Sequence, residues 1–275
     1  MTERSKRFKR GLDVYGEMTA NRFGNCLNPG LADLECDFPF LVDAAMSFAI
    51  GDVWGRSEID DKTRELAMVA ALGALGASSY VQLRQHAEYA LVFGATGDEL
   101  RELVYLTTVS AGFPRALNMA AEIAAVLQTA GIDGPGPERD EAVDRHRRGL
   151  DEMAVLGRVA EVDIDGHPVL GPLKRDFPFL VEAVVDYSMG DVWTRVTLDP
   201  AVRQIATVAA FGALGDAWPQ MRLHTGHALR LGVSRELLKE VIHILTVAAG
   251  FPLALNAAAE MRTAFAAFDA AETSA

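Results

Sequence analysis

The chain has 275 residues, half of them hydrophobic, which is enough apolar material for one large core or two ordinary ones. It has 38 acidic residues against 26 basic ones, giving a formal net charge of −12 at pH 7. A balance this acidic repels a phosphate backbone, so the composition excludes general nucleic-acid binding.

The first ten residues are rich in lysine and arginine, but no apolar run follows them, so they do not predict a signal peptide. The two cysteines, Cys26 and Cys36, lie ten residues apart near the start. Because the rest of the sequence offers no disulfide framework, the cytoplasm is the expected location.

Helices are expected throughout, since no segment shows the alternation of a half-buried strand. Asp60 is the predicted N-cap of a helix whose residues 66–75 carry leucine or valine at every third place. Alanine and glycine between them would let another helix approach closely. The next helix should begin near Ser78 or Ser79 and end at Gly94, a glycine suited to the position after a helix.

A third helix should begin near Thr96 or Gly97 and run to the Gly-Phe-Pro at 112–114, and a fourth should span Arg115–Gln128. Further along, Val241–Ala259 carries no formal charge and approaches the ~20 residues that cross a bilayer. A second Phe-Pro interrupts it, so it predicts buried helices and no membrane span.

The sequence is an internal tandem duplication. Residues 38–41 return as 177–180 and residues 51–54 return as 190–193, an offset of 139. After the loss of one residue, His86 returns as His224 and 112–114 as 250–252, an offset of 138. We therefore expect a first helical repeat at 1–130, a Gly/Pro-rich linker at 131–140 and a second repeat at 141–275.

The best candidates for chemistry are His86 and His224, at equivalent places on the second helix of each repeat. Gln82 and Gln220 precede them by four residues, and Tyr89 and His227 follow by three, so each set shares one helix face. The alternative is a buried histidine bonded to a backbone carbonyl. Retention in both copies beside a polar residue favours function.

Arg64 and Arg203 stand in the first turn of a helix, where the helix dipole does not favour a cation. Each therefore needs a specific partner, either a substrate carboxylate or a structural carboxylate such as Glu122 or Glu260. The paired Trp54 and Trp193 indicate packing and a place in the wall of a pocket.

Other repeated polar residues favour structural roles. Asn118 with Glu122, and Asn256 with Glu260, are four apart on a helix and predict interhelical hydrogen bonds. His224, His227 and His243 could converge on a metal, but the first repeat keeps only one of the three histidines, and no His-Glu-x-x-His or paired-cysteine spacing occurs. The prediction is therefore no metal.

These motifs together resemble the carboxymuconolactone decarboxylase family. The resemblance covers nearly the whole chain, once in each repeat. Its pattern is Gly-Asp-Val-Trp-x-Arg, then Asp-x-x-x-Arg, a histidine on a helix and Gly-Phe-Pro. The first repeat carries it at Asp52, Trp54, Arg56, Asp60, Arg64, His86, Gly94 and 112–114, and the second at Asp191, Trp193, Arg195, Asp199, Arg203, His224, Gly232 and 250–252.

The resemblance implies an all-helical unit that oligomerises, with pockets where units meet. Single-unit relatives are trimers of dimers, so three tandem chains would supply six units and a homotrimer is expected. Relatives of the decarboxylase branch act without a cofactor on a lactone bearing carboxylates. Carried over, His86 and His224 would be proton donors.

Another branch of the family, the alkyl hydroperoxidase D-like proteins, uses a Cys-x-x-Cys just before the helix histidine. Those places hold Ser79 and Gln82 in the first repeat, and Ala217 and Gln220 in the second. Without sulfur at either place, disulfide peroxidase activity is excluded.

The sequence thus predicts a cofactor-independent carbon–carbon lyase acting on a small carboxylated lactone or oxo acid. His86 or His224 would transfer the proton, and Arg64 or Arg203 would orient the anion. Trp218, His227 and His243 enrich the second repeat, which has Gln204 where the first has Glu65, and favour it as the active copy. The alternatives are a cofactor-free cyclase or isomerase of a biosynthetic pathway and an inert binding or assembly protein.

Overall fold

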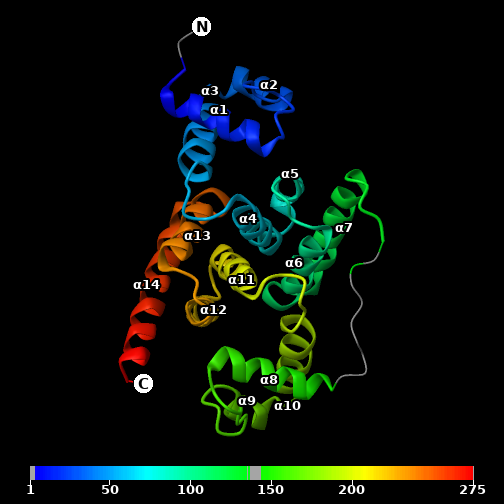
Figure 1. Cartoon of the computed structure of the whole chain (residues 1–275), viewed down its shortest axis with the longest axis vertical. Coiled ribbons are helices and arrows are strands. Elements are labelled where there is room, and N and C mark those ends of the chain that lie inside the picture. The colour runs from blue at the N-terminus through cyan, green and yellow to red at the C-terminus, as the bar shows by residue number, and fades with distance from the viewer. Residues whose placement is uncertain (1–3, 135, 137–143, 275) are drawn as a thin grey trace.

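The structure is a computed structural model that describes residues 4–134, 136 and 144–274, and every element within them is helical (Figure 1). This confirms the all-α prediction. Of the expected 131–140 linker, residues 135 and 137–140 lie outside the described residues.

The helices of the two repeats follow one another in the same order. The first repeat contains α1 (Lys6–Met18), α2 (Pro29–Asp37), α3 (Pro39–Ala44), the π-helical η1 (Ala45–Trp54), α4 (Asp61–Leu75), the short 3₁₀ turn η2 (Ala77–Ser79), α5 (Tyr80–Val92), α6 (Gly97–Ser110) and α7 (Phe113–Thr129). The second contains α8 (Arg145–Gly157), α9 (Leu170–Asp176), α10 (Pro178–Ala183), the π-helical η3 (Val184–Trp193), α11 (Pro200–Leu214), α12 (Trp218–Arg230), α13 (Arg235–Ala248) and α14 (Phe251–Ser274).

The predicted helix starts are confirmed by their caps. Asp60 accepts a hydrogen bond from the Thr63 backbone N–H at the start of α4, and Asp199 caps α11 in the same way, ahead of its proline. Thr96 and Glu99 form a reciprocal capping box at the start of α6, which satisfies two backbone donors at once.

At the centre of the molecule α4 packs against α11, its counterpart in the other repeat (Figure 1). All residues from 63 to 74 of α4 are buried. The small residues of both helices permit this, as predicted. A Cβ on Gly73 would lie 2.4 Å from the Met119 sulfur, and one on Gly212 would lie 2.5 Å from a Leu245 methyl. Both glycines therefore leave room for the ends of the Met119 and Leu245 side chains, which pack against α4 and α11 from the outer helices.

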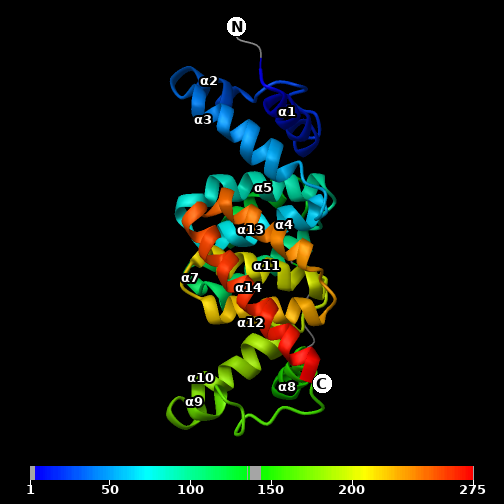
Figure 2. The ribbon, with the colours of Figure 1, turned by 90° about the vertical axis from the view of Figure 1, so that its left-hand side faces the viewer.

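Two helical arms extend from this core at opposite ends of the long axis, α1–η1 at one end and α8–η3 at the other (Figures 1 and 2). Within each arm the first helix touches the π-helix backbone to backbone. A Cβ on Gly11 would lie 2.0 Å from the Met46 carbonyl oxygen, and a Cβ on Gly149 would lie 2.0 Å from that of Val185. Both glycines lie in the sequence Arg-Gly-Leu-Asp, at residues 10–13 and 148–151, so this repeated motif serves packing.

Each arm also packs on the other repeat. The ring of Phe48 in η1 stacks on Phe251 of α14 with centroids 5.6 Å apart. Reciprocally, Tyr187 of η3 stacks on Phe113 of α7 at 5.8 Å, and its hydroxyl is hydrogen-bonded to Thr108 at 2.7 Å. The two repeats are therefore interlocked by equivalent contacts and do not form separate bodies.

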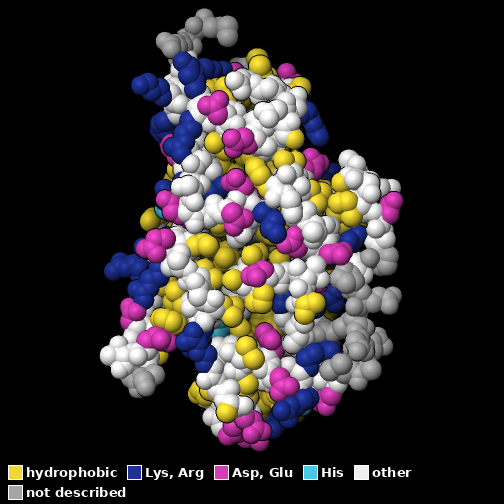
Figure 3. All heavy atoms as spheres, in the orientation of Figure 1, with side chains coloured by type: hydrophobic (Ala, Val, Ile, Leu, Met, Phe, Trp, Pro, Cys, Tyr) yellow, Lys and Arg dark blue, Asp and Glu magenta, His cyan; other side chains and the backbone are white. Residues whose placement is uncertain are grey.

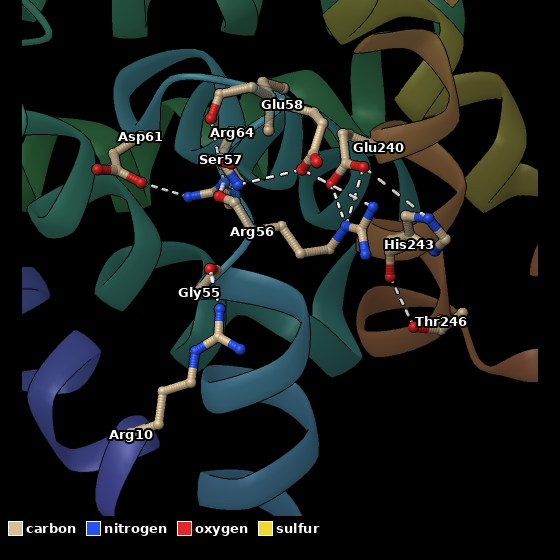
Figure 4. A network of polar contacts seen from close by, with 11 residues as sticks. Arg10, Gly55, Arg56, Ser57, Glu58, Asp61, Arg64, Glu240, His243 and Thr246 are labelled. Carbon is tan, nitrogen blue, oxygen red and sulfur yellow. Dashed lines mark hydrogen bonds and ion pairs between the residues drawn. The ribbon is translucent and has the colours of Figure 1, made fainter. Parts of the chain in front are cut away.

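Reciprocal ion pairs join the same two repeats. Arg56 donates from Nε to both carboxylate oxygens of Glu240, at 2.9 and 2.8 Å (Figure 4). In the mirrored pair, Arg195 Nε donates to Glu102 at 2.6 Å. Both glutamates are 3% exposed. Such buried charges require these partners, so the pairs specify how the repeats dock.

Among residues 4–134 and 144–274, no helix is both long enough and apolar enough to cross a bilayer. The uncharged stretch noted in the sequence is divided between α13 and α14 by Gly250, whose φ is +87°. Its halves pack on each other and on α11, and α13 also packs on α4 of the first repeat. The prediction of buried helices is confirmed for Val241, Ile244 and Ala257.

Candidate active site

In the first repeat His86 of α5 forms a hydrogen-bonded contact with the side chain of a buried glutamate. Its Nδ1 lies 2.6 Å from Glu65 Oε2, and the indole Nε1–H of Trp54 donates to the other oxygen at 2.5 Å. Glu65 lies on α4 and is fully buried. These two bonds orient both the carboxylate and the imidazole ring, while His86 Nε2 makes no hydrogen bond to a described residue.

The second repeat keeps the geometry but changes the charge. His224 Nδ1 lies 2.8 Å from Gln204 Oε1, so a neutral amide stands where the first repeat has a carboxylate. The imidazole ring is surrounded by the rings of Trp193, Phe211 and His227, with centroids 5.2, 5.5 and 5.4 Å away.

These surroundings disfavour the charged form of the second-repeat histidines. Burial lowers the pKa of His224 to about 3, and the neighbouring His227 adds to the effect. Burial likewise lowers the pKa of His227 to about 4. Both rings are therefore neutral near pH 7. The amide of Gln204, the hydrogen-bond partner of His224, has no charge with which to oppose this effect.

The buried histidine pair predicts acid sensitivity. The unfolded chain protonates both rings near pH 6.5, whereas the folded chain resists protonation until about pH 4 and 3. As the pH falls below 6.5, the free energy of unfolding should fall by about 1.4 kcal/mol per pH unit for each histidine. Urea unfolding at pH 7 and pH 5 measures this slope.

The combined variant His224→Gln with His227→Gln removes both groups and should flatten that pH dependence. His146→Gln, which replaces an exposed histidine paired with Asp186, serves as the control and should leave it unchanged. An unchanged slope in the combined variant would contradict the assignment.

The structure does not bring the predicted glutamines to the histidines. Gln82 and Gln220 are exposed at the first turns of α5 and α12, and neither hydrogen-bonds to a histidine. The partner is Glu65 or Gln204 instead, because the histidine Nδ1 faces the preceding helix. The Glu/Gln difference is visible in the sequence, but its role is not, because Glu65 and His86 lie 21 residues apart on two different helices.

Tyr89 and His227 were predicted to share a helix face with the histidines, and His243 was considered as a further metal ligand. Tyr89 and His227 lie against the histidines, with centroids 5.5 and 5.4 Å away. His243 is separate: it lies on α13, is half-exposed and faces Glu240 at 3.9 Å (Figure 4). Among the described residues, no group of three or more His, Cys, Asp or Glu side chains is arranged to hold a metal ion.

Arg64 and Arg203 hold the loop that precedes their helices. The Arg64 guanidinium donates to the backbone carbonyls of Arg56 and Ile59 and pairs with Asp61 (Figure 4). Arg203 likewise donates to three carbonyls of its own loop, those of Trp193, Arg195 and Leu198. A substrate carboxylate would have to displace these bonds, so the geometry favours the structural alternative for both arginines.

The repeated acidic residues of the last helices form interhelical ion pairs, in agreement with their expected structural role. Glu122 of α7 pairs with Arg84 of α5 at 2.9 Å, and Glu260 of α14 pairs with Arg222 of α12. The asparagines that precede these glutamates are exposed.

Two cavities in the described part of the chain lie close to residues discussed above. One of about 230 Å³ lies between the end of α1 and α5, and Tyr89 forms part of its wall. The other, of about 730 Å³, lies between α6 and α7 and is lined by Arg101, Tyr105 and Gln128 among others. Only the smaller cavity adjoins the side chains around His86.

Known proteins resemble this chain in sequence and fold. It is 35% identical over 121 residues to the 4-carboxymuconolactone decarboxylase of Acinetobacter baylyi. The aligned region covers 43% of this chain and 87% of that enzyme. An uncharacterised 15.0 kDa protein of Paracoccus denitrificans is 36% identical over 74 residues, covering 27% of this chain and 54% of that protein.

A crystal structure of a protein described as a gamma-carboxymuconolactone decarboxylase subunit, from Burkholderia xenovorans, has the same fold. Its TM-score is 0.55 at 24% identity, over 99% of this chain and all of that one. The model of the carboxymuconolactone decarboxylase family matches residues 39–126 and again 178–263. The chain belongs to the carboxymuconolactone decarboxylase family, with two copies of the family's domain in tandem.

Proposed function

We propose that this protein is a cofactor-independent carbon–carbon lyase that acts on a small carboxylated lactone or oxo acid, with His86 as its proton-transfer residue. The observation that carries the proposal is the contact of His86 with the buried Glu65, within a chain of the carboxymuconolactone decarboxylase family. The 35% identity to a 4-carboxymuconolactone decarboxylase supports the reaction class.

The chemistry requires a charged acid. When the bond to the departing carboxylate breaks, its electron pair is delocalised onto a conjugated carbonyl as a dienolate, and carbon dioxide leaves. The dienolate then takes a proton on carbon from the Nε2–H of imidazolium His86, and solvent restores that proton. Glu65 stabilises the imidazolium before the transfer and fixes the ring so that Nε2 points away from α4.

The need for a charged acid favours the first repeat as the active copy, whereas the sequence favoured the second. His224 is neutral near pH 7 because burial lowers its pKa to about 3. It can accept a hydrogen bond through Nε2, but it holds no proton there to deliver. We therefore propose a structural or binding role for the second-repeat histidines.

Turnover of γ-carboxymuconolactone tests the proposal. Purified wild type, His86→Gln and the matched His224→Gln would be compared by loss of substrate and release of carbon dioxide. We expect His86→Gln to lose about 10²- to 10⁴-fold in kcat, the usual contribution of a general acid. His224→Gln should retain most of the activity. A larger loss in His224→Gln would assign the chemistry to the second repeat, and equal activity in all three would refute histidine-mediated proton transfer.

We further propose that three chains assemble, as the family resemblance implies. Large apolar side chains are exposed in equivalent pairs, and apolar side chains extend over the middle of one face (Figure 3). The pairs are Phe38 and Phe177, Phe40 and Phe179, Leu41 and Leu180, Phe113 and Phe251, and Leu117 and Leu255. Phe40 and Phe179 are 83% and 80% exposed, which is unusual for a ring unless a partner covers it.

The combined variant Phe40→Lys with Phe179→Lys should therefore shift the molar mass measured by light scattering from that of a trimer to that of a single chain. Val196→Lys, at another exposed apolar residue outside these pairs, is the control and should leave the trimer intact. A wild-type protein that elutes as a single chain would rule out this assembly.

A further inference from the structure

The smaller cavity is separated from the proposed proton-transfer residue of the first repeat by Tyr89, which lines the cavity and packs edge to face on His86. Its wall combines the end of α1 and the following turn with one face of α5. Polar groups predominate among its named side chains: Tyr15, Thr19, Arg22, Asn28, Gln85, Glu88 and Tyr89. At about 230 Å³ it is smaller than the pockets that hold drug-sized ligands, so it fits a small molecule.

A chain of side-chain contacts runs from this cavity to the buried carboxylate. Asn28 donates to the Tyr15 hydroxyl at 2.6 Å, and Tyr15 contributes to raising the pKa of Tyr89, beside which it lines the cavity. The Tyr89 ring meets His86 edge to face, and His86 contacts Glu65. Burial raises the pKa of Tyr89 above its ordinary value, so this hydroxyl remains a hydrogen-bond donor at any physiological pH.

The cavity wall carries two side chains of opposite charge, Arg22 and Glu88. The Arg22 guanidinium and the Glu88 carboxylate are exposed, and neither forms an ion pair or a side-chain hydrogen bond with a described residue. The turn that carries Arg22 is held in place. Ala20 and Asn21 adopt left-handed φ angles of 50° and 57°, and Phe23 stacks on Tyr15 with centroids 6.3 Å apart. Non-glycine residues in this conformation are strained and persist where the surroundings fix them.

The second repeat has lost this polar wall. At the places that correspond to Tyr15, Gln85 and Glu88 it has Met153, Leu223 and Gly226. The loss parallels the change from Glu65 to Gln204, because the polar wall and the charged partner of the histidine are both present only in the first repeat.

We propose that the cavity between α1 and α5 is the substrate-recognition pocket of the first repeat and that the carboxylated lactone or oxo acid it takes also carries a hydroxyl group. The ligand's carboxylate pairs with Arg22, and its hydroxyl donates to Glu88. This assignment rests on the proposed function, which places the chemistry at His86. It adds an N-terminal specificity element, since Tyr15, Arg22 and Asn28 precede the segment that matches the family model.

Binding of 4-hydroxybenzoate, measured by isothermal titration, tests the pocket without requiring turnover. Benzoate lacks the hydroxyl and phenol lacks the carboxylate, so both should bind about tenfold more weakly or worse, as expected when a hydrogen bond to a charged group is lost. Arg22→Ala should weaken 4-hydroxybenzoate by a similar factor but leave phenol unaffected, and Glu88→Gln should weaken 4-hydroxybenzoate but leave benzoate unaffected.

Two further variants distinguish a wrong assignment of the pocket from a wrong proposed function. Arg101→Ala, in the wall of the larger cavity, should leave binding unchanged, and a loss there would overturn the proposal by moving the site. His86→Gln should keep the affinity while losing turnover. Equal affinity of wild type and Arg22→Ala, or no binding by wild type at millimolar ligand, would also overturn the pocket. Turnover that depends on His86 would then still support the proposed function alone.

Discussion

Replacing Glu65 by glutamine is expected to lower kcat by about 10²- to 10⁴-fold, as much as loss of the histidine itself. The substitution keeps the size of the side chain and a hydrogen bond to His86 but removes the charge that stabilises the imidazolium. It reproduces in the first repeat the arrangement of Gln204 and His224 in the second. Steady-state turnover of γ-carboxymuconolactone, with its pH profile, measures the effect.

The matched control is the reciprocal change, Gln204→Glu. It places a carboxylate beside His224 and should leave kcat close to that of wild type if the first repeat carries the reaction. The new charge should also make protonation of His224 easier and so weaken the loss of stability at acid pH. If Glu65→Gln retains full activity with an unchanged pH profile, the carboxylate has no part in the chemistry.

Replacing Glu102 by glutamine is expected to lower the free energy of unfolding by about 3–5 kcal/mol, the usual effect of breaking one side of a buried ion pair. Glu102 contacts Arg195 at 2.6 Å and Arg203 at 3.7 Å, and all three side chains are largely buried. Burial already lowers the pKa of Arg203, and Glu102 opposes that effect. Without the carboxylate, two cationic groups stay at the junction of the repeats with less compensation.

Urea unfolding of Glu102→Gln and of Glu260→Gln measures this loss of stability. Both variants carry the same substitution, so they differ only in its position. Glu260 pairs with Arg222 at the surface, where an ion pair contributes only about 0–1 kcal/mol. The loss of free energy of unfolding in Glu240→Gln should be intermediate between those of the other two variants, because its partner Arg56 is 37% exposed. Equal midpoints for Glu102→Gln and wild type would show that the reciprocal ion pairs do not hold the repeats together.

Helices and their ends could be predicted because they depend on neighbours in the sequence. Asp60, Thr96 and Ser234 act as caps through bonds to backbone groups three residues on, and an offset of 138 or 139 residues carries each assignment to the other repeat. The small residues of α4 also predicted a close helix contact. Their partner, α11, is the same helix of the other repeat, which the pattern of α4 alone does not specify.

The sequence by itself determined the duplication, the all-α class, the family resemblance and the two equivalent histidines. Only the tertiary structure decided that His86 meets Glu65 and not Gln82, and that Arg64 binds backbone carbonyls of its own loop. Helical periodicity tells which residues share a face, but it does not tell which other helix that face meets. The charge of each histidine site depends on that second helix, because a buried imidazole is governed by the groups packed against it.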